Sequence, residues 1–214
     1  MNMKKYLFLM LLALPMVCLF TACGGDGDDD ANAPQNTVVV VKEDGTTSNG
    51  SIFSAIDDKN FYLDYIKYTL EESHLTVSGY DKLGFKGVAK IVPKITYKGN
   101  TYEVLSIKGY SEEGPGAFTK CNILTSIVIP NSVTLIENDA FYKCSNLTSV
   151  IIGDGVKTID SDAFRDCKSL TSVTIGNSVT SIGSRAFYEC TGLTSITIPN
   201  SVKSIGWDAF KGCI

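Results

Sequence analysis

From residue 124 onward the chain reads LTSIVIPNSVTLIENDAFYKCSN (124–146), LTSVIIGDGVKTIDSDAFRDCKS (147–169), LTSVTIGNSVTSIGSRAFYECTG (170–192) and LTSITIPNSVKSIGWDAFKGCI (193–214). One pattern is written four times, and its leading leucine and its Ala-Phe pair recur every 23 residues. A repeat of this length is typical of a solenoid, in which stacked coils bury apolar side chains that one coil alone leaves exposed. We therefore expect parallel coils with strand beside strand.

The apolar positions predict how each coil runs. Ile127 and Ile129 alternate with smaller or branched residues, which indicates a strand. A turn pair follows in every coil, and Val133 and Ile136 then predict a second short extended stretch. The Ala-Phe-x-x-Cys segment closes the coil in a tight turn.

The repeat LTSVTIGNSVTSIGSRAFYECTG resembles that of the BspA-like leucine-rich repeat proteins, a family of bacterial surface proteins. The stretch ITYKGNTYEVLSI (95–107) resembles the hairpin that precedes the repeats in that family, so the resemblance covers roughly residues 60–214. It implies a mainly β fold, a short leucine-rich-repeat solenoid of 23-residue coils over 105–214 with an N-terminal antiparallel β cap over 53–104. The segment KGYSEEGPG (108–116) departs from the pattern by six extra residues, and we expect an inserted loop there.

Residues 1–22 have the features of a lipoprotein signal peptide. Lys4 and Lys5 precede an apolar stretch that is too short for a comfortable membrane span and is broken by Pro15. The stretch LFTAC (19–23) resembles a lipobox, although Phe20 stands where leucine is more usual. Cleavage before Cys23 and lipidation of its thiol are expected; the alternative is an ordinary signal peptide cut near Ala22.

An acidic run, GGDGDDD (24–30), follows that cysteine and begins a tether and linker over 23–52. Its position resembles the lipoprotein export signal of Bacteroidetes-type bacteria, which implies an outer-membrane, lipid-anchored protein facing the cell exterior. The residues carrying this signal are Asp26, Asp28, Asp29 and Asp30. A solvated tether is the alternative. A calcium loop is rejected, because Ala31 and Thr37 stand where such a loop needs glycine and glutamate.

Five cysteines recur with the repeat, namely Cys121, Cys144, Cys167, Cys190 and Cys213. Equivalent positions on stacked coils point in parallel at a spacing near the upper limit for a disulfide, about 4.5 Å between Cβ atoms. We expect a ladder of buried thiols, with disulfide or metal use as the alternatives.

No enzymatic chemistry is indicated. His74 is the only histidine, and none of the common nucleophile, phosphate-binding or metalloprotease motifs occurs. Acid pairs such as Asp160 and Asp162 are expected at exposed, solvated positions. We predict no catalytic residue, no metal site and no cofactor, and the net charge of −4 without a basic stripe argues against nucleic acid.

Recognition is expected where outward positions vary from coil to coil on a constant scaffold. The candidate binding residues are Glu137, Asn138, Tyr142, Asp160, Arg165, Tyr188, Trp207 and Lys211. Trp207 is the foremost of them, because exposed tryptophan is enriched in binding hot spots. The alternatives are that these positions vary because water tolerates any residue, and that Trp207 packs over the last coil.

The family resemblance implies a displayed protein that binds proteins or adheres to cells, with host extracellular-matrix or plasma proteins as partners. A glycan-binding accessory protein and a structural envelope lipoprotein are the alternatives. No polar cap follows Ile214, from which we expect a shortened gene product, end-to-end self-association or marginal solubility.

Overall fold

The computed structural model describes residues 38–42 and 46–214. Within these ranges the chain forms strands and no helix. The strands are β1 (Val38–Val40), β2 (Phe53–Ala55), β3 (Asn60–Leu63), β4 (Ile66–Leu70), β5 (Leu75–Tyr80), β6 (Val88–Lys90), β7 (Lys94–Tyr97), β8 (Asn100–Ile107), β9 (Ser126–Ile129), β10 (Leu135–Ile136), β11 (Ser149–Ile152), β12 (Thr158–Ile159), β13 (Ser172–Thr174), β14 (Ser181–Ile182) and β15 (Ser204–Ile205).

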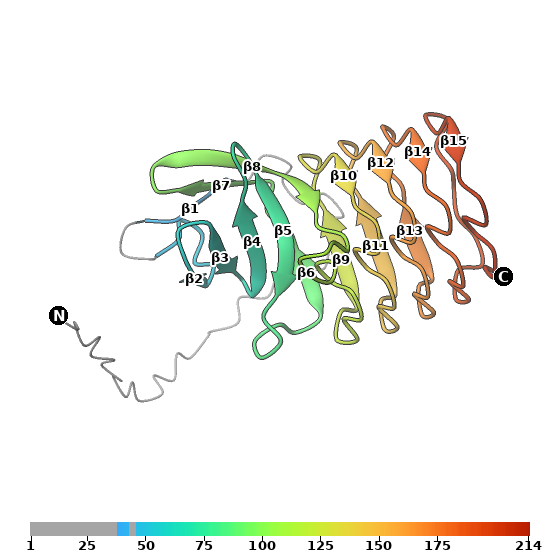
Figure 1. The fold of residues 1–214 in the computed structure, drawn as a ribbon, viewed down its shortest axis with the longest axis horizontal. Helices are drawn as coiled ribbons and strands as arrows, with labels where there is room; N and C mark the ends of the chain where they lie inside the picture. The colour runs from blue at the N-terminus through green and yellow to red at the C-terminus, as the bar shows by residue number, and fades with distance from the viewer. Residues whose placement is uncertain (1–37, 43–45) are drawn as a thin grey trace, which may run out of the picture. The chain divides into compact units, whose positions relative to one another are not determined.

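The repeats contribute two rows of parallel strands, as the 23-residue period predicts (Figure 1). Strands β9, β11 and β13 form one row, and Ser126, Ser149 and Ser172 are register partners in it. Strands β10, β12, β14 and β15 form the other row with the same 23-residue offset. The predicted mainly β solenoid is confirmed.

The Ala-Phe-x-x-Cys turn provides a third line of hydrogen bonds between coils. Phe141 N–H donates to Ala163 O at 2.8 Å, and Lys143 N–H donates to Arg165 O at 2.9 Å. In the four repeats from residue 124 onward, the residue before the alanine and the residue before the cysteine adopt the left-handed conformation, for example Asp139 (φ 57°) and Lys143 (φ 59°). In the second coil the same two positions carry Asp162 (φ 56°) and Asp166 (φ 60°). Alternate residues of the turn therefore donate to the next coil, which holds equivalent side chains of neighbouring coils side by side.

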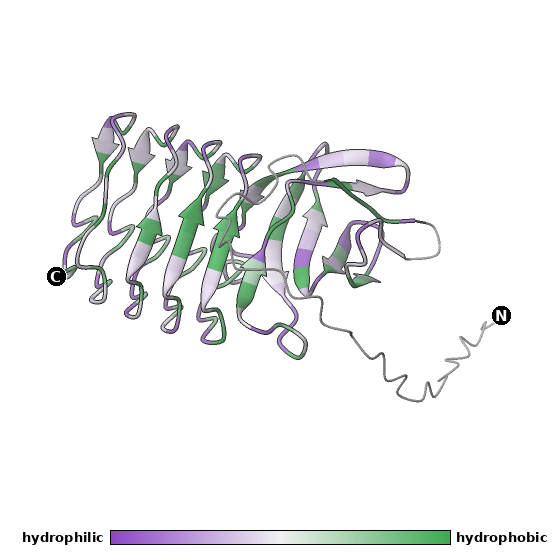
Figure 2. Cartoon of the chain, turned by 180° about the vertical axis from the view of Figure 1, so that it is seen from behind, coloured by the Kyte–Doolittle hydropathy of each residue, from purple (hydrophilic) through white to green (hydrophobic). Residues whose placement is uncertain are grey.

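A stack of phenylalanine rings runs through the core. Phe118, Phe141, Phe164, Phe187 and Phe210 lie with successive ring centroids 4.9 to 5.3 Å apart and ring planes within 6° of parallel. Figure 2 shows the hydrophobic segments of successive coils side by side. The core is thus continuous from coil to coil, and no coil has a complete core of its own.

The cap is built from antiparallel pairs, as predicted. Strands β2, β3, β4 and β5 pair antiparallel in sequence, and β7 and β8 form a hairpin. The hairpin turns at Lys98 (φ 49°) and Gly99 (φ 79°), where two consecutive left-handed residues suit a two-residue turn. Strand β1 lies in the segment expected to be linker and pairs with β7.

The cap also continues both rows of the solenoid. Strand β6 pairs in parallel with β9, while β8 pairs in parallel with both β5 and β10. The ring of Tyr80 stacks on Phe118 at 5.9 Å and 4°, so the aromatic stack begins in the cap. Ile107 pairs with Ile136 and Phe118 stacks on Phe141, which confirms that residues 108–116 contain an insertion between two in-register positions.

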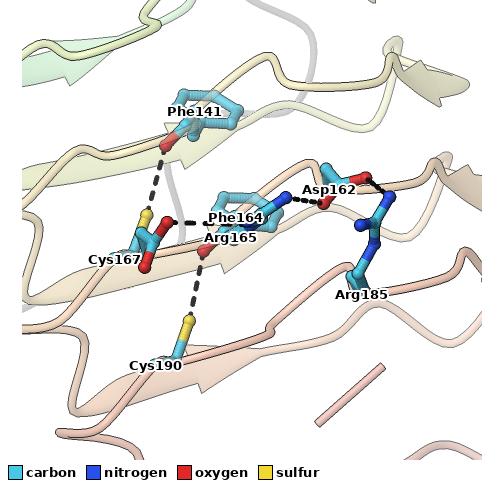
Figure 3. Close-up of polar contacts among 8 residues, drawn as sticks. Phe141, Asp162, Phe164, Arg165, Cys167, Arg185 and Cys190 are labelled. Atoms are coloured by element: carbon cyan, nitrogen blue, oxygen red, sulfur yellow. Dashed lines mark hydrogen bonds and ion pairs between the residues drawn. The ribbon is translucent and has the colours of Figure 1, made fainter. Parts of the chain in front are cut away.

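The cysteines form a ladder of thiols, and all five are free. Cys167 Sγ donates to Phe141 O at 3.2 Å, and Cys190 Sγ donates to Phe164 O at 3.1 Å (Figure 3). The same contact joins Cys144 to Phe118 at 2.9 Å. The prediction of unpaired thiols is therefore confirmed for all five, and that of burial for the first four, while Cys213 in the last coil is half-buried.

Burial makes the thiols of Cys167 and Cys190 resistant to ionisation and couples them to stability at high pH. Burial raises the pKa of Cys190 from its ordinary value of 9.0 to about 12, and it raises the pKa of Cys167 as well. A raised pKa means that the folded state holds the proton more tightly. The stabilisation is complete below pH 9 and is lost as the pH rises from about 9 towards 12.

We expect the free energy of unfolding in urea to fall more steeply above pH 9 in the wild type than in Cys190→Ala. Iodoacetamide at pH 8, read peptide by peptide, should modify Cys167 and Cys190 at least about tenfold more slowly in the folded protein than in guanidinium. Identical alkaline slopes for wild type and Cys190→Ala would contradict the assignment.

Candidate functional site

The residue that follows each phenylalanine forms an outward row along the turns, which we call the tyrosine–arginine row: Tyr142, Arg165, Tyr188 and Lys211. The guanidinium carbon of Arg165 lies 5.6 Å from the ring centroid of Tyr142 and 5.4 Å from that of Tyr188. Lys211 Nζ lies 6.0 Å from the ring centroid of Tyr188. A cation between two aromatic faces restrains both rings, so the row presents a preorganised surface.

Asp162 forms ion pairs with Arg165 of this row and with Arg185 of the next coil. Its Oδ1 accepts a hydrogen bond from Arg165 Nη1 at 3.2 Å, and its Oδ2 accepts one from Arg185 Nη2 at 3.0 Å (Figure 3). The expectation that Asp162 is exposed was wrong, because it is 8% exposed. The two ion pairs compensate for its burial. Burial and the neighbouring charge of Asp162 raise the pKa of Asp139, which occupies the equivalent position one coil earlier.

Arg185 was not among the predicted site residues, although the repeat carried a signal for it. It stands where the other three coils have Asp139, Asp162 and Asp208. Positions 23 residues apart lie side by side on neighbouring coils of a solenoid. An arginine 23 residues after an aspartate therefore predicts an ion pair between the two coils. The repeat alignment alone was sufficient to find that contact.

The other predicted residues lie apart from this row in their contacts. Glu137 and Asp160 are half-buried and accept hydrogen bonds from backbone N–H groups. Glu137 Oε2 accepts from Gly109 N of the inserted segment at 2.9 Å, and Asp160 Oδ1 accepts from the adjacent Ser161 N at 2.7 Å. Asn138 is half-buried, and its Nδ2 lies 3.5 Å from Asp139 Oδ2. Trp207 is 74% exposed. The structure therefore brings Tyr142, Arg165, Tyr188 and Lys211 together, whereas Asn138 and Asp160 contact neighbours in sequence and Glu137 holds the inserted segment.

The predicted lipidation and export residues, Cys23 and Asp26, Asp28, Asp29 and Asp30, lie outside the described residues. Within 38–42 and 46–214, no helix has the length and apolar character needed to cross a membrane.

Comparison with known proteins agrees with this architecture. The profile of the BspA type leucine rich repeat region matches residues 112–214 in six copies. These residues belong to the BspA-type leucine-rich repeat family. No curated protein sequence matches the chain.

The structural relatives are also bacterial leucine-rich repeat proteins. One from Bacteroides ovatus ATCC 8483 is 39% identical with a TM-score of 0.59, over 70% of this chain and 38% of that protein. One from T. pallidum is 28% identical with a TM-score of 0.60, over 70% of this chain and 65% of that protein. The chain thus spans less than two thirds of the length of either relative. BspA-type repeats are a scaffold for protein interaction rather than an enzyme fold, which fits an outward row of side chains on a rigid stack.

Proposed function

We propose that this protein acts by binding rather than catalysis, as a lipid-anchored surface protein whose tyrosine–arginine row contacts a protein partner in adhesion. The observation that carries the proposal is the Tyr142–Arg165–Tyr188 sandwich. It offers aromatic faces and a guanidinium on a rigid scaffold, and tyrosine and arginine are enriched where binding energy concentrates. The partner class is an extracellular-matrix or plasma protein, as the family resemblance implies.

The row supports a contact with both apolar and acidic character. Tyr142, Arg165 and Tyr188 are half-buried, so little side-chain freedom remains to be lost on binding. In the last coil Trp207 and Lys211 are exposed, and Lys211 also pairs with Asp208 at 3.2 Å. A partner surface carrying carboxylates beside apolar groups complements this arrangement.

Replacing Tyr188 is expected to weaken binding without unfolding the coil. We expect Tyr188→Ala to lose roughly tenfold in affinity, since it removes one aromatic face from Arg165 and exposes that cation to water. The measurement is surface plasmon resonance against purified extracellular-matrix and plasma proteins, each immobilised separately. Lys157→Ala is the matched control, because Lys157 is exposed and outside the row. Equal binding by Tyr188→Ala and wild type would refute the row as the contact surface.

Display on the cell rests on a separate argument and a separate test. The LFTAC stretch before Cys23 and the acidic run after it support lipid attachment and export. Protease added to intact cells should remove the wild-type repeats, while Cys23→Ala and the triple replacement of Asp28, Asp29 and Asp30 by alanine should leave them protected or mislocalised. Protection of a lipidated wild type would place the repeats inside the envelope and exclude adhesion.

A further inference from the structure

A cleft of about 800 Å³ lies between the cap and the inserted loop. One wall is the outer face of β3, β4 and β5, where Thr69 Oγ1 lies 2.8 Å from Asn60 Oδ1 and 2.7 Å from Ser78 Oγ. The opposite wall is the loop at 113–117. The insertion that breaks the repeat therefore creates this cleft, and its floor carries neutral hydrogen-bonding groups.

Lysines surround this cleft and continue beyond it. Lys67, Lys82 and Lys120 line the cleft, and Lys120 also lines a second hollow of about 440 Å³ together with Lys143 and Lys168. Lys120 therefore lies at the edge of both hollows. We call these five residues the lysine track.

The track is a local excess of positive charge on an acidic protein. None of its lysines makes an ion pair with any residue in the described part of the chain. Asp166 lines the second hollow, and Lys67 helps to lower the pKa of Asp57 after the larger effect of backbone hydrogen bonds. Lys108, which also lines the cleft, is neutralised by Glu113 at 3.0 Å. The whole chain nevertheless carries a net charge of −4, so the track is a distinct electrostatic feature.

The residues that line the two hollows suit a sulfated polysaccharide better than a nucleic acid. Lysine ammonium groups act as flexible point charges that suit sulfate groups spaced along a chain, and the Asn60, Thr69 and Ser78 groups suit sugar hydroxyls. Tyr80 is the only aromatic residue that lines either hollow in the described structure, and its ring is stacked on Phe118. Single-stranded nucleic acid needs free aromatic faces on which bases stack, and this site does not offer them.

We propose that the lysine track binds a sulfated polysaccharide, with its sugar hydroxyls in the cleft and its sulfates on the lysines. The structure also limits the length of chain bound. The position before each cysteine is Lys120 and Lys143 in the first coils but Asp166 and Glu189 in the next two. Because this position changes from lysine to an acidic residue, we expect the polysaccharide-binding site to end at the second full coil.

The test compares charge removal inside and outside the track. Lys120 and Lys143 both have φ of 59°, and asparagine tolerates that conformation, so Lys120→Asn/Lys143→Asn removes charge with little strain. The control is Lys157→Asn/Lys203→Asn, which removes the same charge from exposed lysines outside both hollows. Affinity of the purified chain for a fluorescent heparin-derived decasaccharide is measured in about 50 mM NaCl, where screening is weak.

We expect the track variant to bind about tenfold more weakly, with a shallower dependence on salt, and the control variant to bind as wild type does. Lys67→Gln/Lys82→Gln in the cap should weaken binding similarly, which keeps the test decisive if the first variant fails to fold by circular dichroism. Tyr188→Ala should retain decasaccharide binding, which separates this site from the tyrosine–arginine row. An equal loss in the control variant, tighter binding of a DNA duplex of matched charge, or undiminished binding of the desulfated chain would each overturn the proposal.

Discussion

Phe164→Ala is expected to lower the free energy of unfolding by about 3–5 kcal/mol. The ring is fully buried between Phe141 at 4.9 Å and Phe187 at 5.2 Å, with ring planes within 1° and 6° of parallel. Removing it leaves a cavity that two neighbouring coils share, and the turn hydrogen bond from Phe164 N–H to Ala186 O at 2.8 Å limits collapse of the backbone into it. Urea unfolding followed by circular dichroism measures the loss.

Phe210→Ala is the matched control for that experiment. Its ring is half-buried and contacts the stack on one side only, at 5.3 Å from Phe187. We expect roughly half the loss of Phe164→Ala, because one stacking contact disappears and a half-exposed site buries less apolar area. Equal losses at the two positions would show that the stack does not carry stability between coils.

Asp162→Ala is expected to lower the free energy of unfolding by about 2–3 kcal/mol. Two partly exposed arginines lose their shared carboxylate, an effect that solvent screening reduces. Alanine must also adopt φ near 56°, which costs about 1 kcal/mol relative to a residue that tolerates it. Thermal and urea unfolding at low ionic strength measure both contributions together.

Two further variants separate the charge from the backbone. Asp162→Asn keeps tolerance of the left-handed conformation and should cost about 1 kcal/mol. Asp208→Ala imposes the same backbone change (φ 54°) but loses only one ion pair, with the exposed Lys211 at 3.2 Å. A loss from Asp208→Ala as large as that from Asp162→Ala would mean that the arginine pairs contribute nothing to stability.

The repeat made most of the solenoid predictable. A 23-residue period assigns every coil residue a neighbour in the next coil, so the parallel strands, the phenylalanine stack and the thiol ladder all follow from one alignment. The Lys98–Gly99 turn and the inserted loop were also predictable from local sequence. Asp162 was misplaced because it was judged as an isolated acid, whereas its column also contained Arg185.

The cap and the lysine track were not predictable in the same way. Nothing in the cap repeats, so its parallel pairing of β5 with β8 and of β6 with β9 depends on tertiary packing that no sequence period reports. Lys67 and Lys82 come beside Lys120 only through that packing. The exposed faces of the solenoid could be predicted from positions 23 residues apart in the repeats. The cleft where the cap meets the solenoid could not be predicted in this way.

The hydrogen bonds between coils bear on how such a protein gains length over evolutionary time. The turn of each coil donates backbone hydrogen bonds to the turn of the next coil, and the strands pair only with their nearest neighbours. An in-frame duplication of one repeat would therefore add one phenylalanine to the stack and one cysteine to the row of thiols. The backbone donors and acceptors of the added coil would match those of its neighbours. The gene can lengthen or shorten by whole repeats while the cap keeps its own contacts. The number of coils, and with it the length of the solenoid, can therefore change by selection without a new fold.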